Sequence, residues 1–251
     1  NIHDNAYAIG TIDFTGDMPI ILGPDGPSLG GFVCPATIAD AERWKMGQLR
    51  PGDRVRFVSL SADEAASLQE DRKRVLKAPQ VDNLRTNLSS ERVPEVSERP
   101  SAILARGLTN GIDIVYRRAG DSYLLVEMGA LVLDLKLRLQ VTALMSWLDQ
   151  EAPDGIIDLT PGIRSLQVHY DPARLSTARL LDMLRRAEEE MQRAEDLTVP
   201  SRVVHLPLSW RDEQAELAMQ KYQELVREDA PWCPSNVEFI RRINGLPDEQ
   251  A

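Results

Sequence analysis

The sequence contains only two cysteines and three histidines among its 251 residues. Cys34 and Cys233 lie far apart and neither belongs to a CxxC motif, so we expect two reduced thiols and no disulfide framework. His3, His169 and His205 form no HExxH motif and have no cysteine at metal-ligand spacing. We therefore expect no metal site built by this chain.

Long apolar runs and an excess of positive charge are also missing. No run approaches the roughly 18 apolar residues of a membrane span, and the first residues lack the basic and apolar regions of a signal peptide. The 29 Lys and Arg against 39 Asp and Glu give a net charge of -10. Nucleic acids and anionic membranes both attract concentrated positive charge, so we expect neither partner and predict a cytoplasmic location. Because the chain begins with Asn1, we expect it to be part of a longer protein.

Three common catalytic motifs are absent. The sequence has no GxxxxGK[ST] loop, no GxGxxG after an expected strand and no GxSxG nucleophile elbow. A nucleotide held by a glycine-rich loop and a serine-hydrolase site are therefore not expected in this chain.

The local patterns change along the chain and suggest separate domains. The 43% of apolar residues is enough for at least one core. Residues 1–61 show short apolar runs between Gly- and Pro-rich turns, as in a barrel or sandwich, including a turn over 50–53 and an alternating strand expected over 54–60. Residues 63–77 are charged and favour a helix. Residues 78–100 combine prolines, serines and charges without periodicity, which predicts a linker.

Beyond the linker, strand and helix patterns alternate. We predict a hairpin of strands over 112–116 and 123–128, a helix from Asp134, strands over 156–159 and 166–170, a helix over 176–193 and a last strand over 203–207. With an additional first strand, this βαββαβ order predicts an α+β fold with a ferredoxin-like layer. Two helices over 212–228 and 235–244 follow, the second capped by Ser235.

One segment fits two patterns. Leucines at every second position from Leu131 to Leu139 suggest a strand, whereas Leu137, Val141, Leu144 and later apolar residues follow helical spacing. We favour the helix because its pattern continues to a stop before Pro153.

The beginning of the chain concentrates polar and ionisable residues among short apolar ones. Such residues interrupt the alternation expected of a barrel strand, and burying them without partners costs about 1–3 kcal/mol each. A functional site and a network of turns are both consistent with this spacing. The residues are Asn1, His3, Asp4, Tyr7, Asp13, Thr15 and Asp17.

Three stretches, over 1–17, 25–35 and 229–246, resemble one known family. They are similar to the carboxyltransferase region of biotin-dependent urea carboxylases, including the bacterial branch that carboxylates guanidine. The third stretch, which contains Pro231-Trp232-Cys233-Pro234, is not expected in the related 5-oxoprolinase subunits B and C.

The resemblance implies a domain map. Residues 1–77 would be the C-terminal part of a first, cyclophilin-like β-barrel unit, 78–100 the linker, 101–200 a small α/β domain of ferredoxin-like type, and 201–251 the start of a second barrel unit with two helices. The chain would then be a fragment of a longer enzyme and inactive by itself.

The resemblance also implies a reaction. CO2 carried on biotin would be transferred to a nitrogen of guanidine or urea, with ATP consumed in another part of the enzyme. Biotin would be carried by a domain that is not in this chain, because the sequence has no biotin-attachment motif and Lys45-Met46 does not match one. The implied partners are the biotin carboxylase and biotin carboxyl-carrier domains.

On this resemblance, the polar residues at the beginning of the chain receive roles. His3 and Asp4 are candidate catalytic residues, and Asp13 differs from the Asn that urea-preferring eukaryotic relatives have before the Phe. A carboxylate pairs with a guanidinium cation, so Asp13 favours guanidine, unless it only accepts hydrogen bonds from neighbouring backbone. The candidate substrate-binding residues are Asn1, Tyr7, Asp13, Thr15 and Asp17.

Two other functions stay open. A 5-oxoprolinase-type subunit would open the ring of 5-oxoproline with ATP and without biotin. A non-enzymatic binding or regulatory module would occur as a free 28 kDa protein, whereas the carboxylase predicts a biotin-carrying parent of more than about a thousand residues, far above the length of a single domain.

Overall fold

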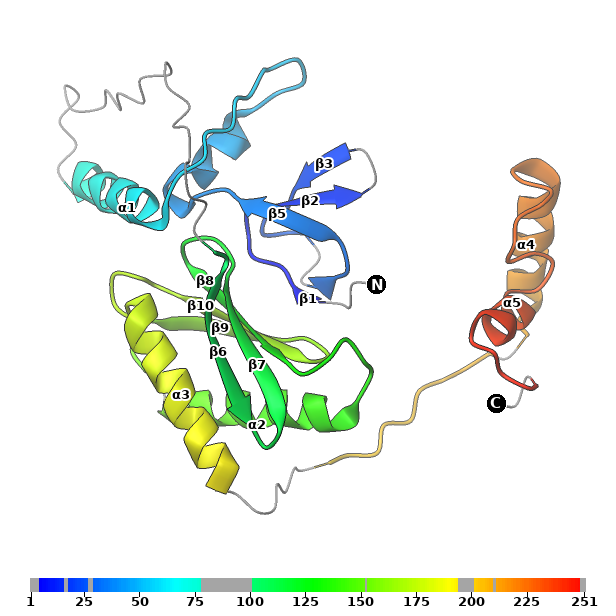
Figure 1. The fold of residues 1–251 in the computed structure, drawn as a ribbon. Helices are drawn as coiled ribbons and strands as arrows, with labels where there is room; N and C mark the ends of the chain where they lie inside the picture. Colours follow the sequence, from blue (N-terminus) through cyan, green and yellow to red (C-terminus); the bar gives the residue numbers. More distant parts are fainter. Residues whose placement is uncertain are drawn as a thin grey trace. The chain divides into compact units, whose positions relative to one another are not determined.

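The computed structural model describes most of the chain, and its contacts divide it into two compact units, Asn1–Val199 and Pro200–Ala251. The predicted linker over 78–100 lies outside the described residues, as do Asn1, His3, Asp4 and Asp17. Figure 1 shows the described residues as coloured ribbon: 5–15, 18–26, 29–77, 101–151, 153–193, 201–209 and 211–248.

Short strands open the first unit and form two small antiparallel sheets. β2 is the central strand of a sheet with the order β3-β2-β5, and β1 pairs with β4. Among the described residues these strands do not close into a barrel, so the predicted barrel stays a prediction. Their bounds are β1 (Asn5–Ala6), β2 (Thr11–Thr15), β3 (Met18–Ile21), β4 (Leu29–Gly30) and β5 (Val33–Thr37).

The predicted strand over 54–60 is wrong. The chain turns at Pro51–Gly52 as expected, but residues 53–61 form no strand. Val55 and Phe57, which alternation would place on a shared buried face, are 44% and 54% exposed. Alternation alone does not make a strand, because the backbone needs a neighbouring strand for its hydrogen bonds, and this segment pairs with none of the described strands.

Two helices flank that segment. The 3₁₀ helix η1 (Asp40–Gln48) was not predicted, whereas α1 (Ala62–Lys77) confirms the helix-favouring pattern before the linker. The start of α1 has a capping box, in which Glu64 N donates to Ser61 Oγ at 3.2 Å and Ser61 N donates to Glu64 Oε2 at 2.6 Å.

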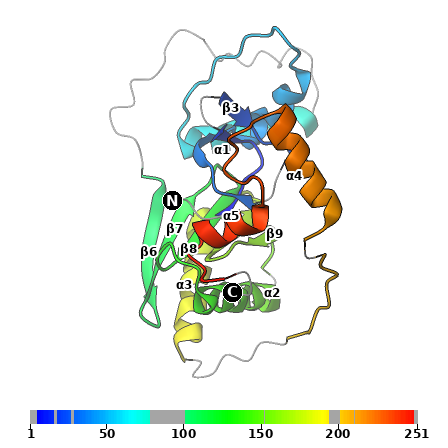
Figure 2. The ribbon, with the colours of Figure 1, turned by 90° about the vertical axis from the view of Figure 1, so that its right-hand side faces the viewer.

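A five-stranded antiparallel sheet forms the centre of the first unit. The strand order is β6-β7-β8-β10-β9, and helices α2 (Leu135–Glu151) and α3 (Thr177–Arg193) lie on the same side of it (Figures 1 and 2). The mixture of helices with antiparallel sheets confirms the α+β class. The strands are β6 (Ile103–Thr109), β7 (Ile112–Arg118), β8 (Tyr123–Met128), β9 (Ile156–Pro161) and β10 (Ser165–Tyr170).

The core lies between this sheet and its two helices. Alternate residues of β8 and β10, such as Leu124, Val126, Leu166 and Val168, are completely buried in it. Because successive side chains of a strand point to opposite faces, the residues between them face away from the helices. Among these is Gln167, which is only 2% exposed, so the second face of the sheet is covered as well.

The structure resolves the ambiguous leucine segment in favour of the helix. In α2, Leu137, Val141, Leu144 and Leu148 are buried, as helical spacing predicts, while Leu133 is 80% exposed. Asp134 accepts a hydrogen bond from Lys136 N at 2.8 Å, which confirms the predicted N-cap.

The last predicted strand of the ferredoxin-like layer, over 203–207, is wrong. Residues 201–209 form no strand. The predicted order is otherwise followed by β8, α2, β9, β10 and α3. Both edges of β8 are already paired, however, with β7 on one side and β10 on the other. A strand following α3 therefore has no place beside β8.

The second unit contains two capped helices. α4 (Glu213–Leu225) and α5 (Asn236–Ile243) confirm the two predicted helices. Asp212 caps the first by accepting from Gln214 N, and Ser235 caps the second by accepting from Glu238 N at 3.3 Å, as predicted. The described residues of this unit form no strand, so the start of a second barrel stays a prediction.

Candidate functional site

Two of the predicted site residues have described side chains, and the first is Tyr7. It lies between β1 and β2, and its hydroxyl accepts a hydrogen bond from Phe32 N at 2.9 Å. A Cβ atom at Gly30 would lie 2.3 Å from the Tyr7 hydroxyl oxygen, so only glycine allows this approach. Tyr7 is thereby tied to the segment between β4 and β5.

Asp13 is the second described site residue. It lies in the middle of β2, opposite Ile20 of β3, and it is only 3% exposed. Its Oδ1 atom has no hydrogen-bond partner among the described residues. A buried carboxylate oxygen without a donor costs free energy, which makes it a ready acceptor for N–H groups of a small ligand.

Cys34 on β5 lies near Asp13. Partial burial raises the pKa of the Cys34 thiol, and the negative charge of Asp13 raises it further. The sulfur also contacts Phe32 O at 3.4 Å. Tyr7 and Asp13 therefore interact with the same short segment. Tyr7 accepts a hydrogen bond from Phe32 N, and the charge of Asp13 acts on the Cys34 thiol.

The remaining site assignments stay predictions. The backbone of Thr15 is part of β2 and pairs with Met18. The other four assigned residues lie outside the described residues: Asn1, His3, Asp4 and Asp17.

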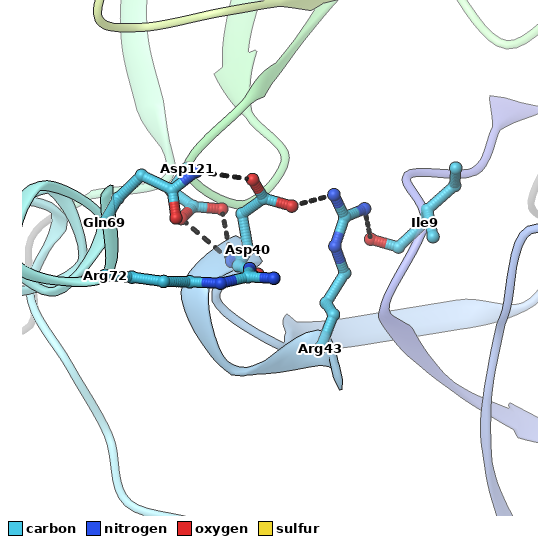
Figure 3. Close-up of polar contacts among 6 residues, drawn as sticks. All are labelled: Ile9, Asp40, Arg43, Gln69, Arg72 and Asp121. Carbon is cyan, nitrogen blue, oxygen red and sulfur yellow. Dashed lines mark hydrogen bonds and ion pairs between the residues drawn. The ribbon is translucent and has the colours of Figure 1, made fainter. Parts of the chain in front are cut away.

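A polar network that the sequence did not predict joins the N-terminal part to the β7–β8 hairpin (Figure 3). The Arg43 guanidinium pairs with the Asp40 carboxylate and donates to Ile9 O at 3.3 Å. The backbone N of Asp40 donates to both oxygens of Asp121, at 3.2 and 3.0 Å. Asp40 and Arg43 are three residues apart on η1, but nothing local in the sequence indicates Asp121 as a partner.

The helix α1 adds two contacts to this network. Gln69 Nε2 donates to Asp40 Oδ2 at 2.9 Å, and Arg72 donates to Asp40 O at 3.1 Å (Figure 3). Burial raises the pKa of Asp121, although the positive charges of Arg43 and Arg118 oppose this. These contacts fix α1 against η1, and η1 against the hairpin.

His169 on β10 packs against Tyr123 of the neighbouring strand β8. Its ring stacks on Tyr123 with the ring centres 4.1 Å apart and the planes 6° from parallel. Burial and the charge of Arg43 lower the pKa of His169, and Asp158 opposes this. His205 is exposed.

Metal-binding clusters and membrane spans are both missing from the described part of the chain. It contains no group of three His, Cys, Asp or Glu residues that could hold a metal ion. None of its helices is long and apolar enough to cross a membrane. Cys34 and Cys233 are free thiols. Lys45 pairs with Glu42, and its Nζ lies 5.9 Å from the centre of the Trp44 ring.

Two family models match the chain. The carboxyltransferase domain, subdomain A and B, matches residues 1–59, and the carboxyltransferase domain, subdomain C and D, matches residues 114–251. The β3-β2-β5 sheet thus belongs to the first match, and most of the five-stranded sheet belongs to the second.

The chain is similar to several longer proteins. Urea amidolyases of Lachancea kluyveri and Saccharomyces cerevisiae are 36% and 37% identical over 246 residues, which is 98% of this chain and 13% of theirs. The crystal structure of the Kluyveromyces lactis urea amidolyase matches with a TM-score of 0.81 at 36% identity, over 100% of this chain and 15% of that chain. The chain thus spans only a small part of these relatives. It belongs to the carboxyltransferase domain family and is similar to the carboxyltransferase region of urea amidolyases and urea carboxylases.

Proposed function

We propose that the chain forms the acceptor-binding part of a carboxyltransferase that transfers a carboxyl group to a nitrogen of guanidine or urea. The proposal rests on one observation, the buried Asp13 carboxylate with an oxygen that has no partner among the described residues. In a chain of this family, such an oxygen is suited to accept an N–H of the substrate.

The reaction places three demands on the protein. The acceptor nitrogen must be oriented, its proton must be taken as the N–C bond forms, and water must be kept away from the activated carboxyl group. Biotin, bound to another domain, supplies that activated carboxyl group, and ATP is consumed elsewhere in the parent enzyme. Asp13 orients the acceptor, Tyr7 contributes to its binding, and His3 and Asp4 are our candidates for the proton transfer.

Charge favours guanidine as the acceptor. Guanidine is a cation at neutral pH, and its planar fork of N–H groups can pair with both oxygens of a carboxylate. Urea is neutral and gains only an ordinary hydrogen bond from the same group. Asp13 therefore favours guanidine over urea, with Asn1, Thr15 and Asp17 as additional substrate contacts.

We also propose the domain map. Residues 1–77 complete a first β-barrel unit, 78–100 link it to a ferredoxin-like domain over 101–200, and 201–251 open a second barrel unit. The exposed apolar side chains of the β3-β2-β5 sheet, among them Met18, Ile20 and Val33, support this map because they leave apolar surface for further parts of a barrel. We place the enzyme in the cytoplasm.

The test is an assay of the full-length protein with urea and guanidine side by side. ATP hydrolysis and fixation of labelled bicarbonate should depend on the acceptor and should be faster with guanidine. This chain purified alone should show no turnover. A full-length protein that carboxylates neither acceptor, or that opens 5-oxoproline without biotin, would refute the proposed function.

A further inference from the structure

Gln167 on β10 bonds to the segment that carries Tyr7. With its amide oriented to satisfy both partners, its nitrogen donates to Ala6 O at 2.6 Å and its oxygen accepts from Ala8 N at 3.0 Å. Gln167, Ala6 and Ala8 are all buried, at 2%, 7% and 3% exposure. A buried amide that satisfies both of its partners holds this backbone in one position.

These two hydrogen bonds lie on either side of Tyr7. The Tyr7 hydroxyl in turn accepts from Phe32 N, two residues before Cys34. A shift of the backbone at Ala6 and Ala8 would therefore move Tyr7 and the segment beside Asp13. The residues connected in this way are contiguous in space but come from three distant parts of the sequence.

A second contact, at Ile9 and Gly10, holds the same segment in place. Arg43 donates to Ile9 O at 3.3 Å. Gly10 adopts φ +90°, and its Cβ position lies 3.1 Å from Arg43 Cδ, so the turn fits closely against this side chain. Arg43 approaches from η1, whereas Gln167 reaches the segment from the five-stranded sheet and bonds to both neighbours of Tyr7.

We propose that Gln167 is a positioning residue of the acceptor site: from the five-stranded sheet it fixes the backbone on both sides of Tyr7 and thereby sets where Tyr7 and the Asp13–Cys34 pair lie. This rests on the proposed function. It assigns to the second matched part of the chain a positioning role in a site carried by the first.

Kinetics of the full-length protein test the proposal. Gln167→Leu keeps the volume and removes both hydrogen bonds, and we expect kcat/KM for the acceptor to fall at least about tenfold, through KM and kcat together. ATP hydrolysis in the absence of acceptor should be unchanged. Val168→Ala is the matched control, because Val168 is the next residue on β10 but is buried on the opposite face, in the helix-covered core.

The control separates positioning from stability. Both variants should lower the melting temperature, but only Gln167→Leu should lower kcat/KM per folded molecule. Equal effects of the two variants on kcat/KM, or none from Gln167→Leu, would overturn the proposal.

A second readout does not depend on the reaction. Alkylation of Cys34, followed on its peptide by mass spectrometry across pH, reports on the surroundings of the thiol. We expect Gln167→Leu to lower the pKa of Cys34 toward that of an ordinary thiol, and Val168→Ala to leave it unchanged. If the protein carboxylates neither acceptor, the proposed function fails while this measurement still decides the role of Gln167. An identical pH profile in all three proteins would overturn the proposal.

Discussion

Asp13 on β2 and Cys34 on β5 interact across two paired strands: partial burial of the thiol, and after it the negative charge of Asp13, raises the pKa of Cys34. The carboxylate is buried, while Cys34 as a whole residue is exposed. An exposed thiol therefore reports on a carboxylate that is itself buried. The pKa of Cys34 therefore allows the proposed acceptor site to be studied without any substrate.

We predict that Asp13→Asn accelerates alkylation of Cys34 near pH 8. Removing the negative charge lowers the pKa of the thiol, so a larger fraction is present as the reactive thiolate. Peptide-resolved alkylation rates across pH measure this. Asp25→Asn, which changes an exposed carboxylate of the turn after β3, should leave the rate unchanged. A slower or equal rate in Asp13→Asn would show that the two side chains do not interact.

Asp13→Asn should also change the preference for the acceptor. The amide keeps the shape of the side chain and loses its charge, so kcat/KM for guanidine should fall at least about tenfold, or roughly 1.4 kcal/mol in transition-state binding, with urea unchanged or improved. Steady-state assays of the full-length protein with both acceptors measure this. Equal losses for both would indicate a structural role for Asp13 or a role in a step common to both substrates, and an unchanged ratio with intact activity would place it outside the pocket.

The raised pKa of Glu188 predicts that the stability of the folded protein depends on pH. It lies against Gly107 of β6, where a Cβ atom would come within 2.5 Å of its Oε2. Burial and then the neighbouring Glu189 raise the pKa of Glu188 to about 6 from 4.5, while Thr109 opposes the shift. The folded state thus binds this proton more tightly than the unfolded state, and stability falls as pH rises from about 4.5 through 6.

Glu188→Gln should remove this dependence. Because the group is only half buried, we expect a gain of about 1 kcal/mol or less in the free energy of unfolding at pH 7 and no gain at pH 4. Urea denaturation at both pH values measures it. Asp182→Asn, an exposed carboxylate on the same helix, is the control and should show no such difference. A loss of stability at pH 7 in Glu188→Gln would contradict the prediction.

Asp121→Ala should destabilise the first unit. The change leaves the backbone N of Asp40 without its two acceptor oxygens in a partly buried position, at a cost of about 1–3 kcal/mol. Thermal unfolding measures it. The control is Asp154→Ala, which removes an exposed ion pair with Arg174 and should cost at most about 1 kcal/mol. Similar losses in the two variants would mean that the network in Figure 3 adds nothing beyond surface charge.

Limited proteolysis tests the domain map. The prediction that residues 78–100 form a linker rests on composition alone, and this segment contains Arg85, Glu91 and Arg92 as cleavage sites for trypsin and Glu-C. The first cuts should fall between Ala78 and Pro100. First cuts inside 110–190, where the five-stranded sheet and its helices lie, would contradict the map.

The sequence by itself determined the α-helices and the family. Helical spacing of apolar residues and good caps, such as Asp134 before α2 and Ser235 before α5, act within a few residues, so they can be read locally. The three stretches that resemble urea carboxylases are long and specific, and the family comparison confirms them. The sequence also pointed to Asp13, because a carboxylate in an apolar strand breaks the local pattern.

The tertiary structure decided the points that depend on distant partners. Residues 54–60 and 203–207 have strand-like sequences, but a strand exists only where another strand accepts its hydrogen bonds, and here none does among the described residues. The contacts of Gln167 with Ala6 and Ala8 and of Asp121 with Asp40 join residues far apart in the sequence, 81 positions in the second case. No local period encodes such pairs, because folding brings them together through the packing of the sheet, and this is why the positions of Tyr7 and Asp13 could not be derived from the sequence alone.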